Sequence, residues 1–185
     1  MTNPDTSTAA FLGIDPSLTS TGIAVIINGD CNIGLHKPPK EYSKGILRLA
    51  WHVDKLNEVI ETFKPIFAAI EGPSYDSVGK HEELGQLRGV LMLTLHRAGL
   101  RYVVVPPSTL KKYGARNGAA SKEKMIRAAA ERWPGKTFTD DTADAAWAAH
   151  LAKAYKTPMQ HLTRPQIEVL KMLRNNNAAN TGNIW

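Results

Sequence analysis

The sequence has few of the features that mark a secreted or membrane protein. Cys31 is the single cysteine among 185 residues, so no intrachain disulfide can form and the fold does not depend on an oxidising compartment. We expect Cys31 to act as a small, partly buried apolar residue. The N-terminus has no basic, then apolar, secretory signal, and no apolar run approaches the roughly 18 residues that span a bilayer. These absences predict a soluble, cytoplasmic protein without membrane association.

Internal repeats, interdomain linkers and histidines at metal-ligand spacing are also missing. Apolar residues make up 43% of the chain and charged residues 22%, which is typical of a globular protein and excludes wholesale disorder. A chain of 185 residues fits one domain with a substantial core. We predict one domain over residues 8–175 and a polar, flexible tail over 176–185.

Positive charge is concentrated in one part of the chain. The formal net charge is +6 and the isoelectric point is about 9.5. Between Arg101 and Lys136, nine Lys and Arg residues stand against two Glu, so this segment carries more net positive charge than the whole chain. Such a basic segment indicates binding to a polyanion.

The hydrophobic pattern predicts an α/β fold. Short apolar runs predict strands over 11–15, 22–27, 31–36, 66–71 and about 100–105, and the first three form a meander with a tight turn at "INGD". Helical spacing of apolar residues predicts helices over about 46–63, 81–98, 121–132, 141–156 and 165–174. The later alternation of strands and helices is typical of parallel crossovers. Ser121 has the side chain and position of a helix N-cap.

Four acidic residues lie at the ends of these elements. Asp15 ends the first strand and Glu71 ends the fourth, where ligands bind in sheets of this kind. Asp141 and Asp144 are three positions apart at the start of a helix and therefore share one face. Each position also has a purely structural interpretation, because acidic residues stabilise helix N-termini and turns. Asp140 fits that interpretation best, as the N-cap.

Together these acids predict a metal-dependent hydrolase. An Asp, a Glu and a D-x-x-D pair form an oxygen-only site that suits Mg²⁺, or Mn²⁺ in its place, and not zinc. Without cations the carboxylates would repel one another. Two hard cations held there would allow phosphodiester hydrolysis, because one activates water and the other stabilises the leaving oxygen.

Four motifs carry a resemblance to a known family. In order, "GIDPSLTSTGIAV", "AAIEGPSY", "LGQLRGVL" and "DDTADAAWAAHLA" are similar to the motifs of RuvC-type Holliday junction resolvases, a branch of the RNase H-like nucleases. The resemblance covers roughly residues 11 to 155. It implies a five-stranded mixed sheet, with three antiparallel and two parallel strands flanked by helices. It also implies an Mg²⁺-dependent homodimer that nicks four-way DNA junctions symmetrically, with two ions per site.

The resemblance assigns roles to residues that match its motifs. The catalytic and metal-binding acids are Asp15, Glu71, Asp141 and Asp144. The family keeps one lysine after the strand near residue 105 and another at the start of the next helix. The first of these positions corresponds to Lys111 or Lys112, and the second corresponds to Lys124, which is the catalytic candidate. Two neighbours, Lys122 and Arg127, would extend this DNA-binding patch. A solvated basic helix face is the structural alternative.

Two further features are compared with the family. After its glutamate the family places an aromatic residue on a loop that wedges into the junction, and Tyr75 is the single aromatic residue of that loop here. The segment from Leu84 to Leu95 resembles the dimer helix of the family. Packing of its leucines onto the sheet explains them equally well.

Three other functions are considered. The "GID" hairpin also occurs in sugar kinases and related ATPases, but those proteins need two such lobes and Gly-rich nucleotide motifs that this chain lacks. A broader nuclease acting on forks, flaps or structured RNA has the same catalytic residues. A protein that binds branched DNA without cutting it would not need all four acids or Mg²⁺.

Overall fold

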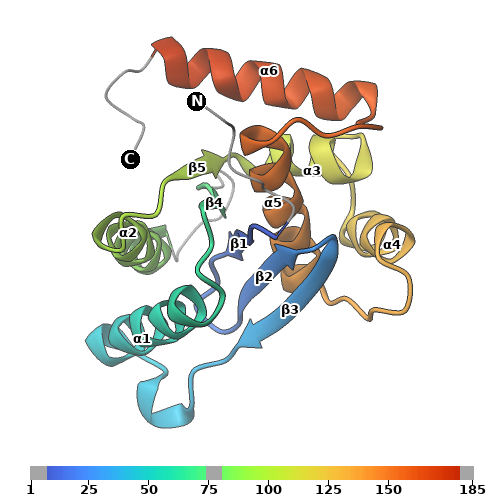
Figure 1. The fold of residues 1–185 in the computed structure, drawn as a ribbon. Coiled ribbons are helices and arrows are strands. Elements are labelled where there is room, and N and C mark those ends of the chain that lie inside the picture. Colours follow the sequence, from blue (N-terminus) through green and yellow to red (C-terminus); the bar gives the residue numbers. More distant parts are fainter. Residues whose placement is uncertain (1–7, 74–80, 180–185) are drawn as a thin grey trace.

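The computed structural model describes residues 8–73 and 81–179 and contains one five-stranded sheet (Figure 1). The strand order is β3-β2-β1-β4-β5; the first three strands pair antiparallel, and β4 lies parallel to both β1 and β5. The strands are β1 (Phe11–Asp15), β2 (Thr21–Ile27), β3 (Asp30–His36), β4 (Phe67–Glu71) and β5 (Tyr102–Val105). This mixed sheet confirms the predicted α/β fold.

The turn between β2 and β3 has the geometry that its sequence predicts. Asn28 and Gly29 have positive φ angles of 53° and 82°. Positive φ at both central residues is the mark of a type I′ turn, whose twist matches that of the flanking strands. This turn fixes the register that pairs Ile27 with Asp30.

Six α-helices surround the sheet in the described part of the chain. They are α1 (Gly45–Phe63), α2 (His81–Arg97), α3 (Pro107–Ala115), α4 (Lys122–Arg132), α5 (Asp140–Lys156) and α6 (Arg164–Ala179), with a short 3-10 helix at Lys40–Tyr42. Five of the six were expected, and α6 continues past its predicted end at residue 174. None of the helices in residues 8–73 and 81–179 is long and apolar enough to cross a membrane.

Helix α3 was not predicted from the sequence. The pair Pro106 and Pro107 indicates the end of a strand, and the residues after it have no clear apolar period. In the structure Pro107 is the first residue of the helix, where a missing N–H costs nothing and a fixed φ favours helix formation. Because Lys111 and Lys112 lie within this helix, its geometry determines the directions in which their side chains point.

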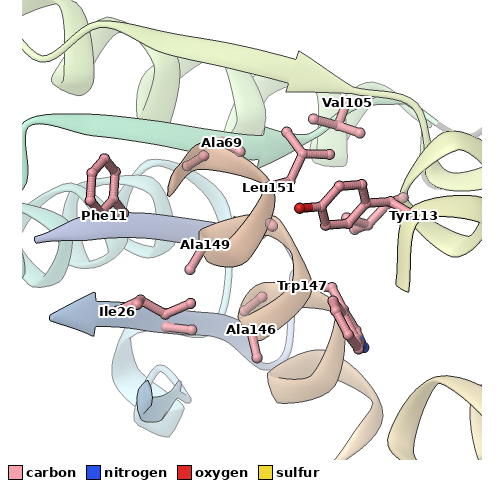
Figure 2. Close-up of a cluster of buried hydrophobic side chains, with 14 of the residues drawn as sticks. Phe11, Ile26, Ala69, Val105, Tyr113, Ala146, Trp147, Ala149 and Leu151 are labelled. Atoms are coloured by element: carbon pink, nitrogen blue, oxygen red, sulfur yellow. The ribbon is translucent and has the colours of Figure 1, made fainter. Parts of the chain in front are cut away.

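The two faces of the sheet are buried in two separate cores. Alternate strand residues such as Leu12 and Ile14 pack with Leu56 of α1 and with the leucines of α2. The intervening residues, such as Phe11 and Ala69, pack with α5 and α3 (Figure 2). Residues of α4 and α6 belong to the same core. The free Cys31 is fully buried in this second core, and so it is more deeply buried than the partly buried apolar residue that the sequence predicts.

The leucines of α2 belong to the interior of this chain. Leu87, Leu91 and Leu95 are at most 1% exposed and pack against the sheet. Their pattern is therefore explained by packing onto the sheet, which is one of the two alternatives that the sequence leaves open. An interface on α2 would have to use the other side of this helix.

Helix α5 crosses the sheet at very short range. A Cβ atom added at Gly13 of β1 would collide with the backbone of Ala145 and Ala149, and one added at Gly22 of β2 would collide with the backbone of Asp141. The helix surface that faces the strands consists largely of alanine. Glycine on the strands and alanine on the helix therefore bring the two backbones together.

We predict that Gly13→Ala destabilises the protein by about 1–3 kcal/mol, because the new methyl group overpacks the contact with α5. Gly34→Ala is the matched control, since a Cβ atom there meets nothing closer than 3.9 Å. Urea unfolding of both variants measures the change in free energy. Equal stability of the two variants would contradict the proposed role of the close contact.

Candidate active site

Two parallel strands carry acidic residues to the same edge of the sheet. In the pairing of β1 with β4, Ile14 lies opposite Ile70, and the next residues along each strand are Asp15 and Glu71. Because side chains alternate along a strand, residues at paired positions point to the same side. The buried residues of both strands are apolar, so each strand has its single charged side chain at its carboxyl end.

The turn after Asp15 is held by its own hydroxyl groups. The backbone N–H of Ser17 donates to Thr21 Oγ1 at 3.2 Å, and this hydroxyl donates back to the carbonyl of Ser17 at 3.0 Å. Such side-chain bonds stabilise a turn without an added element. The chain thus reverses directly into β2 and leaves Asp15 partly exposed.

The remaining acids lie at the start of α5. Thr139 is the N-cap and forms a capping box with Thr142, while Asp140 lies in the first turn. The expectation that Asp140 is the N-cap is therefore wrong by one residue: a threonine hydroxyl satisfies the free N–H group instead. Asp141 and Asp144 lie on one side of the helix. The backbone of Asp141 lies so close to Gly22 of β2 that a Cβ atom added there would collide with it.

The acids are close enough to alter one another's ionisation. Burial, and then the charges of Glu71, Asp144 and Asp141, raise the pKa of Asp15 well above its usual range. Burial and the charge of Asp144 raise the pKa of Glu71 to about 8. Burial and the charge of Asp140 raise the pKa of Asp144 to about 7. The structure thus brings together the four acids that the sequence analysis selects.

The chemistry of this cluster fits a divalent cation. Asp144 Oδ1 is buried and has no hydrogen-bond partner within residues 8–73 and 81–179, and such an atom is normally satisfied in a native protein. Carboxylates that repel one another hold their negative charge more easily when a cation lies between them. In the described part of the chain no three acidic, histidine or cysteine side chains are already grouped as a metal site. Cation binding would therefore have to draw these carboxylates together.

Two neighbouring lysines of α3 face different partners. The charge of Lys111 offsets part of the rise in the pKa of both Glu71 and Asp144. Lys112 Nζ instead lies 3.0 Å from Glu168 Oε2 of α6. The sequence leaves the choice between these lysines open, and the structure places Lys111 on the side of the acids.

The lysines of α4 also diverge. Lys122 forms an ion pair with Asp140, and the charges of Asp141 and Asp144 further raise the pKa of its ammonium group. Lys124 and Arg127 line a separate cavity that none of the four acids lines. Lys122 is therefore the α4 lysine next to the acids, whereas Lys124, the expected catalytic lysine, lies around the helix from it.

Arg88 of α2 is a site residue that the sequence analysis did not select. Its Nε–H donates to the backbone carbonyl of Glu71 at 3.1 Å. Burial lowers the pKa of this half-buried guanidinium, and the charges of Glu71 and Asp15 oppose part of that shift. In the sequence, the one indication of this role was a single arginine directly after Leu87, a leucine that is buried in the structure. The predicted wedge residue Tyr75 lies outside the described residues, so its placement stays a prediction.

The chain resembles one family in sequence and in fold. The sequence model described as "Crossover junction endodeoxyribonuclease RuvC" matches residues 11–149. A RuvC protein of Ruegeria pomeroyi is 32% identical over 168 residues, which cover 85% of this chain and 98% of that protein.

Two solved structures have the same fold. RuvC of Thermus thermophilus, in complex with a Holliday junction substrate, matches with a TM-score of 0.65 and 21% identity, covering 76% of this chain and 90% of that one. The yeast mitochondrial Holliday junction resolvase matches with a TM-score of 0.59 and 14% identity, covering 93% and 85%. These likenesses identify the fold as RNase H-like.

We predict that the protein without metal loses stability as the pH rises from about 4.5 toward 8. Glu71 and Asp144 hold protons more tightly in the folded than in the unfolded chain. Their contribution to the free energy of unfolding is therefore complete at low pH, and it is lost as the pH rises through their raised pKa values. Melting temperatures in EDTA measure this slope, which Glu71→Gln should flatten. Glu61→Gln on the exposed side of α1 should retain the wild-type slope. A Glu71→Gln slope equal to that of the wild type would contradict the prediction.

Proposed function

Because the chain belongs to the RuvC family of crossover junction endodeoxyribonucleases, we propose that it resolves four-way DNA junctions by paired, symmetric hydrolysis that requires divalent cations. The family consists of nucleases that act on DNA. The observation that carries the proposal is that four carboxylates from β1, β4 and α5 lie at one edge of the sheet, close enough to alter one another's ionisation. These are the acids that the family motifs select, namely Asp15, Glu71, Asp141 and Asp144.

The four carboxylates would hold the cations. Asp15 interacts electrostatically with all three other acids, so it would share with them in holding the cations. Oxygen ligands favour Mg²⁺, with Mn²⁺ as a substitute. Bound divalent cations would supply an activated water and stabilise the negative charge that develops on the phosphate.

The side chains around the acids would position the DNA. Lys111 and Lys122 place positive charge beside the carboxylates, where it can hold the phosphates next to the scissile bond. Lys124 and Arg127 extend the positive charge along the other side of α4. Arg88 fixes the end of β4 through the carbonyl of Glu71 and so positions that carboxylate.

A homodimer would match the substrate. A four-way junction has two-fold symmetry, and two copies related by a two-fold axis would place one site on each of two strands. The outer side of α2 supports this arrangement, because Gly85, Gly89 and Leu93 are exposed at helical spacing, and a Cβ atom at either glycine meets nothing within 4 Å. This surface leaves room for close approach of a helix from a second copy.

Cleavage of an end-labelled synthetic junction tests the proposal. We expect paired symmetric nicks in a four-way junction with Mg²⁺, and no nicks in EDTA or with Asp15→Asn. A three-way fork and a linear duplex of matched sequence are the controls. Equal cutting of the fork would indicate a broader branched-DNA nuclease. Tight binding of the junction without cutting would contradict the catalytic role of the acids.

Substitution of the two α3 lysines separates their roles. We predict that Lys111→Gln lowers the single-turnover cleavage rate about tenfold or more, which corresponds to about 1.4 kcal/mol of transition-state stabilisation. Lys112→Gln should stay within about threefold of the wild-type rate, because Lys112 pairs with Glu168 and not with the site. Rates measured at saturating protein with one junction make the comparison. A larger loss in Lys112→Gln than in Lys111→Gln would reverse the assignment.

A further inference from the structure

A basic cavity lies beside α4, apart from the four carboxylates. Its volume is about 710 Å³, and it is formed by the end of α3, by α4, by the middle of α5 and by the connection from α5 to α6. Four cationic side chains line it, and one acidic side chain opposes them. The cationic residues are Arg116, Lys124, Arg127 and Arg132, and the acidic residue is Glu131.

Most of this positive charge is not neutralised within the chain. The ammonium group of Lys124 and the guanidinium group of Arg116 form no hydrogen bond or ion pair within residues 8–73 and 81–179. The Nε atom of Arg127 lies 3.9 Å from Glu131, at the outer limit of an ion pair between exposed side chains. Arg132 lies over the ring of Trp133, with its Cζ atom 5.6 Å from the ring centre, an interaction that leaves its N–H groups available.

The wall of the cavity contains an unsatisfied hydrogen-bond donor. Trp147 lines the cavity and is 4% exposed, yet its Nε1–H is buried without an acceptor among the residues that the structure describes. Figure 2 shows the indole of Trp147 on the opposite side of α5 from Ala149, which faces the sheet. A buried donor of this kind normally has a partner, and an acceptor atom of a molecule bound in the cavity would satisfy it.

We propose that this cavity is a second phosphate-binding site, which holds a backbone phosphate of bound DNA away from the scissile bond. Arginine, lysine and indole groups are all donors, and a phosphate offers several acceptor oxygens with negative charge. Trp147 follows Asp144 by three residues on α5, about 4.5 Å along the helix axis. The same DNA can therefore reach both sites, and in naming DNA as the source the proposal rests on the proposed function.

The indole N–H signal of Trp147 in a ¹H–¹⁵N spectrum tests the site directly. Trp147→Phe identifies the signal, because it removes the N–H and keeps an aromatic ring. Titration with inorganic phosphate, in a buffer otherwise free of it, should shift this signal in a saturable way. Titration with a four-way junction in EDTA, where no cleavage occurs, should shift it as well.

Arg116→Asn tests the contribution of the cationic lining without a large cost in stability. Arg116 has a φ of 63°, and asparagine tolerates this left-handed conformation better than most residues. We expect phosphate affinity to fall about tenfold, as for one lost hydrogen bond to a charged group. The slope of log junction affinity against log salt should fall by about 0.9 for one lost phosphate contact. Arg101→Asn, at an exposed position before β5, is the matched control and should leave both unchanged.

The outcomes separate this proposal from the function on which it rests. If neither phosphate nor junction moves the Trp147 signal, the cavity is not a phosphate site and the proposal is overturned. If phosphate moves it and the junction does not, the assignment to DNA is overturned. If both move it while no DNA is cut under any condition, the proposed nuclease activity fails and the phosphate site stands.

Discussion

The contact between α5 and the first two strands is the constraint on which the site depends. Gly13 and Gly22 have no side chains, and α5 meets them with backbone atoms and alanines. Gly22 also pairs with Asp15 in the sheet. This close contact therefore determines how near α5 lies to the sheet, and it places Asp141 and Asp144 at the end of β1. A larger residue at either glycine would lift the acids of α5 away from those of the strands.

The same packing makes the site electrostatically unfavourable in the protein alone. Burial and mutual repulsion raise the pKa values of Asp15, Glu71 and Asp144. Fixed cations on three different helices, among them Arg88 and Lys122, offset part of this repulsion. The rest of the fold thus supplies the stability that the site loses, and it holds the carboxylates near one another although they repel.

The features predicted well from the sequence are local ones. Apolar runs that end in Asp15 and Glu71, and the D-x-x-D spacing at a helix start, fix each acid relative to its own element. The choice between Lys111 and Lys112 depended on α3, which the sequence did not indicate. Adjacent residues on a helix point about 100° apart, so a missed helix leaves their directions undetermined. The unsatisfied N–H of Trp147 depends on the packing of several elements, and periodicity within α5 does not predict it.

The basic segment around α4 is best understood as two surfaces and not as one patch. Lys122 and Lys124 are two positions apart, which separates their directions by about 200° on a helix. One therefore faces the acids and the other the cavity. Charges on opposite sides of a helix can contact different phosphates of one DNA molecule. A net charge of one sign along a segment does not reveal this division, whereas the helical period applied to the same residues does.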